Sequence, residues 1–311
     1  MAGALLAVGT LAGCRPPHPP LRLGSIVFTG HEPVFVARAM NWLDPAAIRL
    51  IELHSNTDTL RAIAAGQLEG AQLTLDEFLS ARAGGVDLRI VAVLDESRGA
   101  DAVIARPGLR DPERLQGRRF AVEEGAVGAV MLSALLRHHG LEASDIKTVA
   151  IQWGDTVDSF KAGAADYFVT AEPWVSQLEG LSGQRVFDSS AVPGRIVDVM
   201  AVRSDTIATR EDAVQALVSA HFQAVELLRR EPARAAELMA PRLQVAPAEV
   251  AGTLKGLFQP DARASLNMMR ADGELRRNIR ALEQVMLEDG LLTRLSPEDT
   301  LFETRFHPVR S

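Results

Sequence analysis

Several polar clusters follow short apolar stretches of the chain, and they hold the residue types that could bind a ligand or do chemistry. Many stand directly before a helical pattern, where free backbone N–H groups and the positive end of the helix dipole attract anions. An ordinary helix cap explains any single cluster, but their repetition favours a ligand-binding cleft. The clusters are Thr29-Gly30-His31-Glu32, His54-Ser55-Asn56, Thr74-Leu75-Asp76-Glu77, Asp95-Glu96-Ser97, Glu123-Glu124-Gly125, Gln152-Trp153-Gly154, Thr170-Ala171-Glu172-Pro173-Trp174 and Asp198.

Common catalytic and metal-binding patterns are missing from the sequence. HExxH, GxSxG and Walker A motifs do not occur, which argues against the zinc, acyl-transfer and phosphate chemistry that they carry. The seven histidines are scattered, and the single cysteine, Cys14, can form neither an intramolecular disulfide nor a multi-cysteine zinc site. We therefore expect no catalytic residue, no metal and no cofactor.

The composition narrows the class of protein further. An apolar fraction of 47% over 311 residues is enough for one or two folded domains and excludes a disordered chain. The net charge of −7, from 33 Lys and Arg against 40 Asp and Glu, argues against broad nucleic-acid binding. We expect no nucleic-acid partner.

The first fourteen residues, MAGALLAVGTLAGC, form an uncharged run that ends at Cys14. Such a run is too short to span a bilayer as a helix, which takes about 20 residues, and it fits the apolar part of a signal peptide. Leu11-Ala12-Gly13-Cys14 resembles a bacterial lipobox, which predicts a lipidated Cys14 and a membrane anchor. The alternative is an unmodified cysteine near a ragged terminus. Residues 15–20 are rich in proline and predict an extended tether.

Beyond the tether, strand-like and helix-like patterns alternate, which is typical of parallel βαβ units. The stretch Leu88–Leu94 is the clearest buried strand of the first part, and Leu75–Ala83 is one of its helices. From Arg210 onward the pattern is entirely helical. The expected strands cover 23–28, 48–53, 88–94, 102–105, 118–122, 146–151, 166–170, 185–187 and 196–202. The expected helices cover 32–40, 55–66, 75–83, 125–139, 155–162, 173–178, 210–230, 232–240, 247–258 and 271–289.

This order of elements predicts two lobes of similar α/β architecture. We expect residues 21–105 plus 200–311 to form lobe one and residues 106–199 to form lobe two, with chain crossings near 102–108 and 196–203. Ligands bind open α/β sheets at the carboxyl ends of the strands, so a crevice between two lobes combines two such edges.

Five stretches together resemble the substrate-binding proteins of ABC importers in the nitrate, sulfonate and taurine family, which also includes binders of thiamine-precursor pyrimidines. The resemblance runs from about residue 23 to 205, and the helical tail matches in character only. The stretches that carry it are 66–71 (GQLEGA), 74–77 (TLDE), 95–105 (DESRGADAVIA), 115–123 (LQGRRFAVE) and 160–166 (FKAGAAD) leading to Glu172-Pro173-Trp174.

The resemblance implies a two-lobed, type 2 periplasmic-binding fold with two interlobe crossings and a helical C-terminal tail. It also implies a monomer that captures a small solute in the interlobe cleft and delivers it to an ABC permease and its ATPase. The protein would work in the periplasm or at the cell surface, anchored through Cys14. The cleft positions that it implies are Thr29, Ser55, Asn56, Asp76, Ser97, Glu123, Glu172, Trp174 and Asp198.

The many carboxylates among these positions would repel nitrate or a simple sulfonate, since like charges near a protein surface interact by roughly 4 kcal/mol at about 4 Å. They favour a ligand with a cationic or hydrogen-bond-donating part, such as an amino-sulfonate or an aminopyrimidine. Two other functions stay open on the same fold. One is an enzyme like the pyrimidine synthases, which use a cofactor bound to a lysine. The lysines of this chain, Lys147, Lys161 and Lys255, lie outside the polar clusters. The other is a receptor that senses a ligand and signals to a membrane partner.

Overall fold

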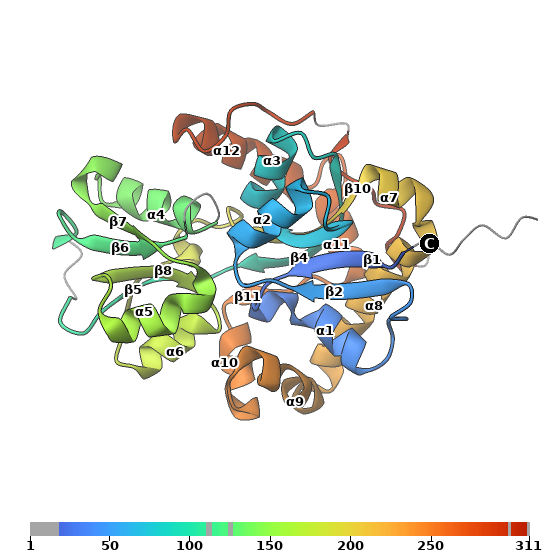
Figure 1. Cartoon of the computed structure of the whole chain (residues 1–311), viewed down its shortest axis with the longest axis horizontal. Helices are drawn as coiled ribbons and strands as arrows, with labels where there is room; N and C mark the ends of the chain where they lie inside the picture. Colours follow the sequence, from blue (N-terminus) through green and yellow to red (C-terminus); the bar gives the residue numbers. More distant parts are fainter. Residues whose placement is uncertain (1–18, 110–113, 124–126, 298–299, 310–311) are drawn as a thin grey trace, which may run out of the picture.

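Two β-sheets, each covered by helices on both faces, form the two halves of the molecule (Figure 1). The computed structural model describes residues 19–109, 114–123, 127–297 and 300–309. Cys14 and most of the predicted tether lie outside these residues. Among the described residues, no helix is long and apolar enough to cross a membrane.

The larger sheet has the strand order β11-β4-β10-β3-β1-β2. Strands β1, β2 and β3 run parallel, and β10 is antiparallel to both β3 and β4. Its strands are β1 (Leu21–Ser25), β2 (Ile48–Glu52), β3 (Gly70–Thr74), β4 (Leu88–Ser97), β10 (Val197–Arg203) and β11 (Leu257–Phe258). Its helices are α1 (Glu32–Ala39), α2 (Asn56–Ala64), α3 (Leu75–Ala83), α7 (Ser204–Thr209), α8 (Glu211–Arg230), α9 (Pro232–Leu243), α10 (Val250–Leu254), α11 (Ala262–Met269) and α12 (Glu274–Glu288).

The smaller sheet has the strand order β7-β6-β8-β5-β9. Strand β5 is antiparallel to its two neighbours, while β6 is parallel to β7 and β8. Its strands are β5 (Asp101–Ala105), β6 (Arg119–Val122), β7 (Lys147–Ala150), β8 (Tyr167–Ala171) and β9 (Gln184–Asp188). Its helices are α4 (Val127–His138), α5 (Thr156–Ala162) and α6 (Trp174–Gly180).

Apolar helix faces explain why each sheet is covered on both sides. In the larger half, α1, α8 and α9 bury one set of apolar side chains against the sheet, and α2, α3, α11 and α12 bury another. In the smaller half, α4 packs on one face, and Phe160 of α5 and Leu178 of α6 pack on the other. Burying this apolar surface is the main force that holds each half together.

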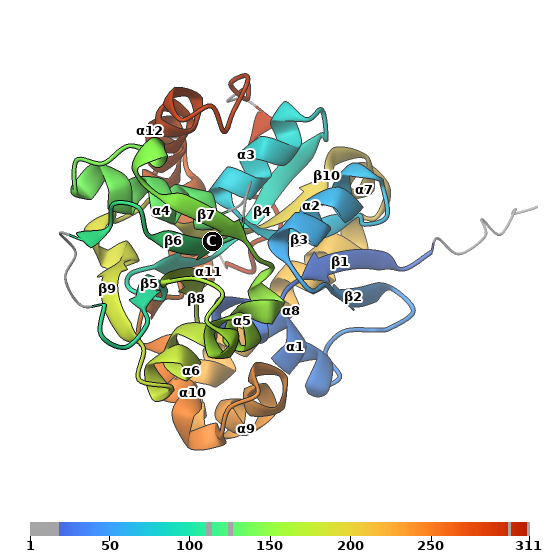
Figure 2. The same ribbon diagram turned by 60° about the vertical axis from the view of Figure 1, so that its left-hand side comes forward.

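The two halves meet along a broad seam. Helix α4 lies beside α12 on one side, and α6 lies beside α9 and α10 on the other (Figure 1, Figure 2). Across the first contact Ser133 Oγ donates to Asp289, and across the second Gln177 Nε2 donates to the carbonyl of Leu243. The seam places the carboxyl ends of β3 and β4 toward the smaller half.

Strand β5 belongs to the smaller sheet and β10 to the larger one, so our placement of residues 101–105 in lobe one and of residues 197–199 in lobe two is wrong. The first crossing falls at residues 98–100, where Gly99 has a φ of +118° that favours glycine. The second crossing, residues 189–196, joins β9 to β10. In the sequence, Arg106-Pro107-Gly108 indicates a turn more strongly than residues 98–100 do, so the predicted boundary was placed there.

Two further predictions about the elements are wrong. We expected no strand at 70–74, but Gly70–Thr74 forms β3, and its Gly70 fits there because an added Cβ would lie 2.8 Å from the carbonyl oxygen of Ala201. We expected an entirely helical tail, but Leu257–Phe258 pairs with β4 as β11. Both segments owe their strand conformation to pairing with distant residues, which local periodicity does not report.

Candidate functional site

A small buried cavity lies between the two halves, and both contribute residues to it. Its volume is about 10 Å³, close to the space that one water molecule needs. Among the described residues of the lining, Asp101 at the start of β5 and Trp153 belong to the smaller half, and the others belong to the larger half. The described residues that line the cavity are Ile26, Phe28, His31, Asn56, Thr74, Glu77, Asp101, Trp153 and Asp198.

The larger sheet brings the acidic side chains of the site together through strand register. Asp198 on β10 stands opposite Asp95 on β4 and opposite Thr74 on β3. Glu77 follows one turn later, because Thr74 caps α3 and Glu77 accepts from the backbone N–H of Thr74 at 3.1 Å. The sequence patterns around Thr74, Asp95 and Asp198 thus converge on one row across the sheet.

Gly30 lets the chain after β1 lie directly against this row. A Cβ at Gly30 would come within 2.1 Å of Asp95 Oδ2 and 2.6 Å of the Phe28 ring. Its neighbour His31 is buried, and its Nδ1 lies 3.4 Å from Ser25 Oγ. The other ring nitrogen, Nε2, lies 3.9 Å from Asp198 Oδ2.

Burial makes the charged forms of these carboxyl groups costly. It raises the pKa of Asp101 to about 7 and the pKa of Asp95 to about 8. It also raises the pKa of Glu77 and of Asp198 well above the ordinary range, and nearby carboxylates, foremost Asp76 for Glu77 and Asp95 for Asp198, raise each further. Burial, aided by the charge of Arg242, lowers the pKa of His31 to about 3, so this ring is neutral at physiological pH.

Several polar atoms around the cavity lack a hydrogen-bond partner within the described structure. They include acceptors on three carboxyl groups, namely Glu77 Oε1, Asp101 Oδ2 and Asp198 Oδ1. Trp153 Nε1 and His31 Nε2 are also unpartnered, although both side chains are only 3% exposed. Buried polar groups normally find partners, so these atoms mark the cavity as a place where a guest would be held.

The nine predicted cleft positions divide into distinct groups. Asn56 and Asp198 line the cavity. Thr29 and Asp76 are buried in the same clusters but do not line it, and their neighbours His31 and Glu77 do. Trp174 packs edge-on against Trp153, with the ring centroids 5.8 Å apart, and so supports a wall.

Ser55 and Glu123 instead join the two halves. The Ser55 hydroxyl caps α2 by accepting from the Asp58 N–H at 3.1 Å, and Gln152 of the smaller half donates to it at 3.3 Å. Glu123 Oε1 accepts from the backbone N–H of Thr57 at 2.7 Å across the seam.

Ser97 and Glu172 lie in the region where the chain crosses between the halves. Ser97 Oγ lies 2.7 Å from Ser189 Oγ, so it ties the first crossing to the second. Glu172 accepts from the backbone and hydroxyl of Ser176 at 3.1 and 3.0 Å. Glu172 also lines a separate surface hollow near the crossings, together with Arg185.

The polar clusters of the sequence contain most of the residues that line the cavity, but in two clusters the predicted residue, Thr29 or Asp76, does not line it while a neighbour does. His31, Thr74, Glu77 and Trp153 each stand in a cluster that the polar pattern singled out. Asp101 belongs to none of them, and the signal that could have found it is an acid at the first position of an otherwise apolar strand.

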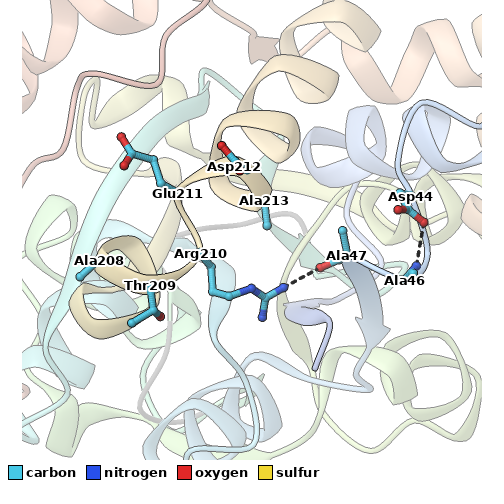
Figure 3. A pocket seen from close by; sticks show the side chains of 9 residues that line it. All are labelled: Asp44, Ala46, Ala47, Ala208, Thr209, Arg210, Glu211, Asp212 and Ala213. Carbon is cyan, nitrogen blue, oxygen red and sulfur yellow. Dashed lines mark hydrogen bonds between the residues drawn. The ribbon is translucent and has the colours of Figure 1, made fainter. Parts of the chain in front are cut away.

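A wider hollow of about 500 Å³ lies elsewhere on the larger half (Figure 3). Its described lining combines four alanines with polar and charged residues such as Arg210 and Asp212, and it includes none of the predicted site residues. Arg210 points across it and donates to the carbonyls of Ala47, at 3.1 Å, and Pro19. This arginine fastens the start of the described chain to the fold, which gives the hollow a structural role.

Comparison with known proteins shows the family. The chain belongs to the NMT1-like family, whose sequence pattern matches residues 15–243. It is 24% identical over 202 residues to the taurine-binding periplasmic protein of Escherichia coli (strain K12), an alignment that covers 63% of this chain and 63% of that relative. The family resemblance predicted from the sequence is confirmed.

Solved structures confirm the fold class. The alkanesulfonate-binding protein SsuA from Xanthomonas axonopodis pv. citri, bound to MOPS, superposes with a TM-score of 0.76 at 20% identity, covering 93% of this chain and 99% of that one. The desulfurization enzyme DSZB has a TM-score of 0.65 at 18% identity, covering 92% and 97%. The two-lobed periplasmic-binding architecture therefore serves both binding proteins and an enzyme.

Proposed function

We propose that this protein is the solute-binding component of an ABC importer, which captures a small polar ligand between its halves and hands it to a membrane permease. The observation that carries the proposal is the buried cavity at the seam, lined from both halves and edged by unpartnered polar atoms. In the structure described this space has room for about one water molecule, so a solute would enter when the halves part. Once the halves close on it, the solute would be desolvated and polar contacts to it would be strong.

Binding would work by closure of the two halves. The structure has contacts of the kind that a closed state needs, such as Thr57 N–H to Glu123 and Gln152 to Ser55 across the seam. The two crossings between the halves are short and tied by Ser97 and Ser189, which suits a hinge. A ligand that touches both halves binds the closed state better and shifts the population toward it.

The relatives suggest the chemical range of the ligand. One binds taurine and another an alkanesulfonate by name, and the sequence resemblance adds nitrate and aminopyrimidines. Uptake of labelled candidate solutes by cells with and without this gene tests the transport role directly. Loss of uptake on deletion supports import, whereas intact uptake with a changed transcriptional response favours the sensing alternative.

We further propose that Cys14 carries a lipid that holds the protein at the membrane, in the periplasm or at the cell surface. Several acyl chains on one residue anchor firmly, since each buried CH₂ contributes about 0.8 kcal/mol. Replacing Cys14 with Ser should move the protein from the membrane fraction to the soluble fraction. Continued membrane association of the variant would contradict the anchor.

The similarity in fold to the desulfurization enzyme DSZB is the reason to consider an enzymatic alternative. The chain's single cysteine is Cys14, outside the described residues, and Lys147, Lys161 and Lys255 are all exposed and do not line the cavity. The described lining of the cavity therefore contains neither a cysteine that could act as a nucleophile nor a lysine that could bind a cofactor covalently. Mass spectrometry of a bound compound after unfolding separates the two functions, because a binding protein returns it unchanged.

A further inference from the structure

We propose that the solute is a small organic cation, an ammonium or amidinium compound without an anionic group, held between Asp101 of the smaller half and Glu77 and Asp198 of the larger half. This inference rests on the proposed function, because it names the class of solute that the same cavity would take. It departs from the ligands that name the relatives, taurine and an alkanesulfonate.

The charges around the cavity carry the first part of the argument. Glu77, Asp101 and Asp198 all line it, and each is 3% exposed or less. No arginine or lysine is among the described residues of its lining. A sulfonate or nitrate placed here would meet carboxyl groups from both halves with no opposing cation.

Arg242, the guanidinium whose charge acts on His31, is already engaged in other contacts. Arg242 pairs with Glu32 and with Glu52, and its Nη2 donates to the carbonyl of Ile26 at 2.7 Å. It also lies over the ring of Phe35, 3.5 Å from the ring centroid. Turning it toward a bound anion would leave the buried carboxyl group of Glu32 without its partner.

A second observation, independent of the acidic cluster, is the pair of unpartnered ring nitrogens. The neutral His31 ring has Nε2 3.9 Å from Asp198 Oδ2, and Trp153, whose buried Nε1–H has no partner in the described structure, lines the same cavity. The indole can only donate, so it calls for a neutral acceptor on the guest, such as a ring nitrogen or a hydroxyl. Donors for the carboxylates and one acceptor for Trp153 describe an ammonium or amidinium compound that also carries an unprotonated ring nitrogen or a hydroxyl.

The apolar side chains of the lining suit the same guest. The guest would enter when the halves part, because the cavity as described has room for about one water molecule. Phe28 and Trp153 are aromatic and line the cavity with Ile26. Aromatic faces attract cations, and Trp does so most strongly. The site thus combines aromatic walls with carboxylates, the combination that recognises an organic cation.

The direction of pH dependence separates a cation from an anion. Asp198 is faced by Asp95 on β4, Asp101 on β5, Glu77 on α3 and the neutral ring of His31. A cation favours the ionised carboxylates, so its binding releases protons and strengthens as pH rises toward neutrality. An anion would need the protonated acids as donors, so its binding would take up protons and strengthen as pH falls.

The test measures binding of six probes to the ligand-free full chain by calorimetry and tryptophan fluorescence: ethanolamine, 3-(aminomethyl)pyridine, pyridine-2-carboxamidine, methanesulfonate, taurine and nitrate. We expect at least one of the first three to bind, with an affinity that increases with pH. Asp198→Asn and Asp101→Asn should each weaken that binding by about thirtyfold or more, as loss of a buried ionic partner does. Asp158→Asn, which removes the same charge from an exposed position of α5, should leave it unchanged.

Two results would overturn the inference. If methanesulfonate, taurine or nitrate binds more tightly as pH falls while the three cations do not bind, the solute is an anion and the proposed function stands without the cation. If none of the six binds, the cation inference fails, and the uptake assay decides the proposed function separately. The wild-type pH series distinguishes a cation from an anion even where a variant does not fold.

Discussion

At the scale of single residues, the main feature of the site is a group of buried carboxyl groups in and beside the cavity. Their charged forms lower the stability of the unliganded protein. Asp95, Asp101 and Asp198 are buried at 2% exposure or less, in surroundings that favour their protonated forms. An isolated buried charge is costly unless it is paired. Retaining three such groups makes physical sense if a bound partner balances them.

We predict that the free energy of unfolding of the unliganded protein falls as pH rises from about 5.5 to about 7.5. Asp101 has a folded pKa of about 7 against about 3.9 in an unfolded chain, so the folded state binds more protons in this window. Stability is then fullest below the unfolded value and is lost as pH rises through the folded value. Each such group changes stability by up to about 1.4 kcal/mol per pH unit.

Urea unfolding at the two pH values measures this slope. Asp101→Asn should flatten it, because the amide does not titrate. A stability that rises across the same window in the wild type would show that these carboxyl groups are not in the surroundings described.

Gly30 gives a second prediction at this scale. Gly30→Ala should destabilise the fold by about 1–3 kcal/mol, the usual cost of overpacking, because the added methyl would collide with Asp95 and Phe28. The matched control is Gly252→Ala in α10, where nothing lies within 4 Å of an added Cβ. That control should be neutral or stabilising by up to about 1 kcal/mol. Equal thermal unfolding temperatures for Gly30→Ala and Gly252→Ala would contradict the close contact of Gly30 with Asp95 and Phe28.

The sequence could predict the clusters but not which member faces the cavity. We predicted Thr29, but its neighbour His31 lines the cavity. We predicted Asp76, but its neighbour Glu77 lines the cavity. Both pairs stand at a turn from a strand into a helix, where a one- or two-residue difference reverses the direction of the side chain. Asp198 was predictable because a single acid interrupts an otherwise apolar strand.

At the scale of elements, the contact between α4 and α12 links the halves far from the cavity lining. Asp289, next to the end of α12, accepts from Ser133 Oγ and Arg137 Nη2, both at 2.5 Å. Since each half contributes one side of this contact, it exists only when the halves are together. In the closure proposed above, this contact would stabilise the closed state.

We predict that Asp289→Ala weakens ligand binding by up to about fivefold and leaves the unfolding free energy nearly unchanged. Arg137 is 46% exposed and Asp289 21%, so the pair is worth at most about 1 kcal/mol, and salt should reduce the difference from wild type. The control Glu226→Ala removes the ion pair with Arg230 within α8 alone and should not affect affinity. An equal effect of both variants would argue against a role in closure.

Most elements were predictable from local pattern, and the exceptions share one cause. Leu75–Ala83 forms the predicted helix because a capping box and apolar spacing agree locally. Strands β3 and β11 carry short or weakly apolar sequences and exist because β10, β1 and β4 offer pairing edges. Such pairing is a property of the assembled sheet, which one window of sequence does not contain.

At the scale of the whole molecule, the two-sheet plan followed from the repeated alternation of strands and helices, and the order of motifs pointed to the family. The exact crossing did not follow, because β4 continues through Asp95, Glu96 and Ser97 beyond its apolar part. Those three residues extend the strand up to the first crossing at residues 98–100. The same continuation places Asp95 beside the cavity and Ser97 at the crossing.

Closure of the two halves around a solute is the central claim, and small-angle scattering tests it most directly. The ligand-free protein and the protein saturated with the tightest-binding of the six probes would be measured under the same conditions. We predict a smaller radius of gyration on saturation, with Asp289→Ala showing the larger value of the two proteins when ligand is limiting. An unchanged radius at full occupancy would contradict closure.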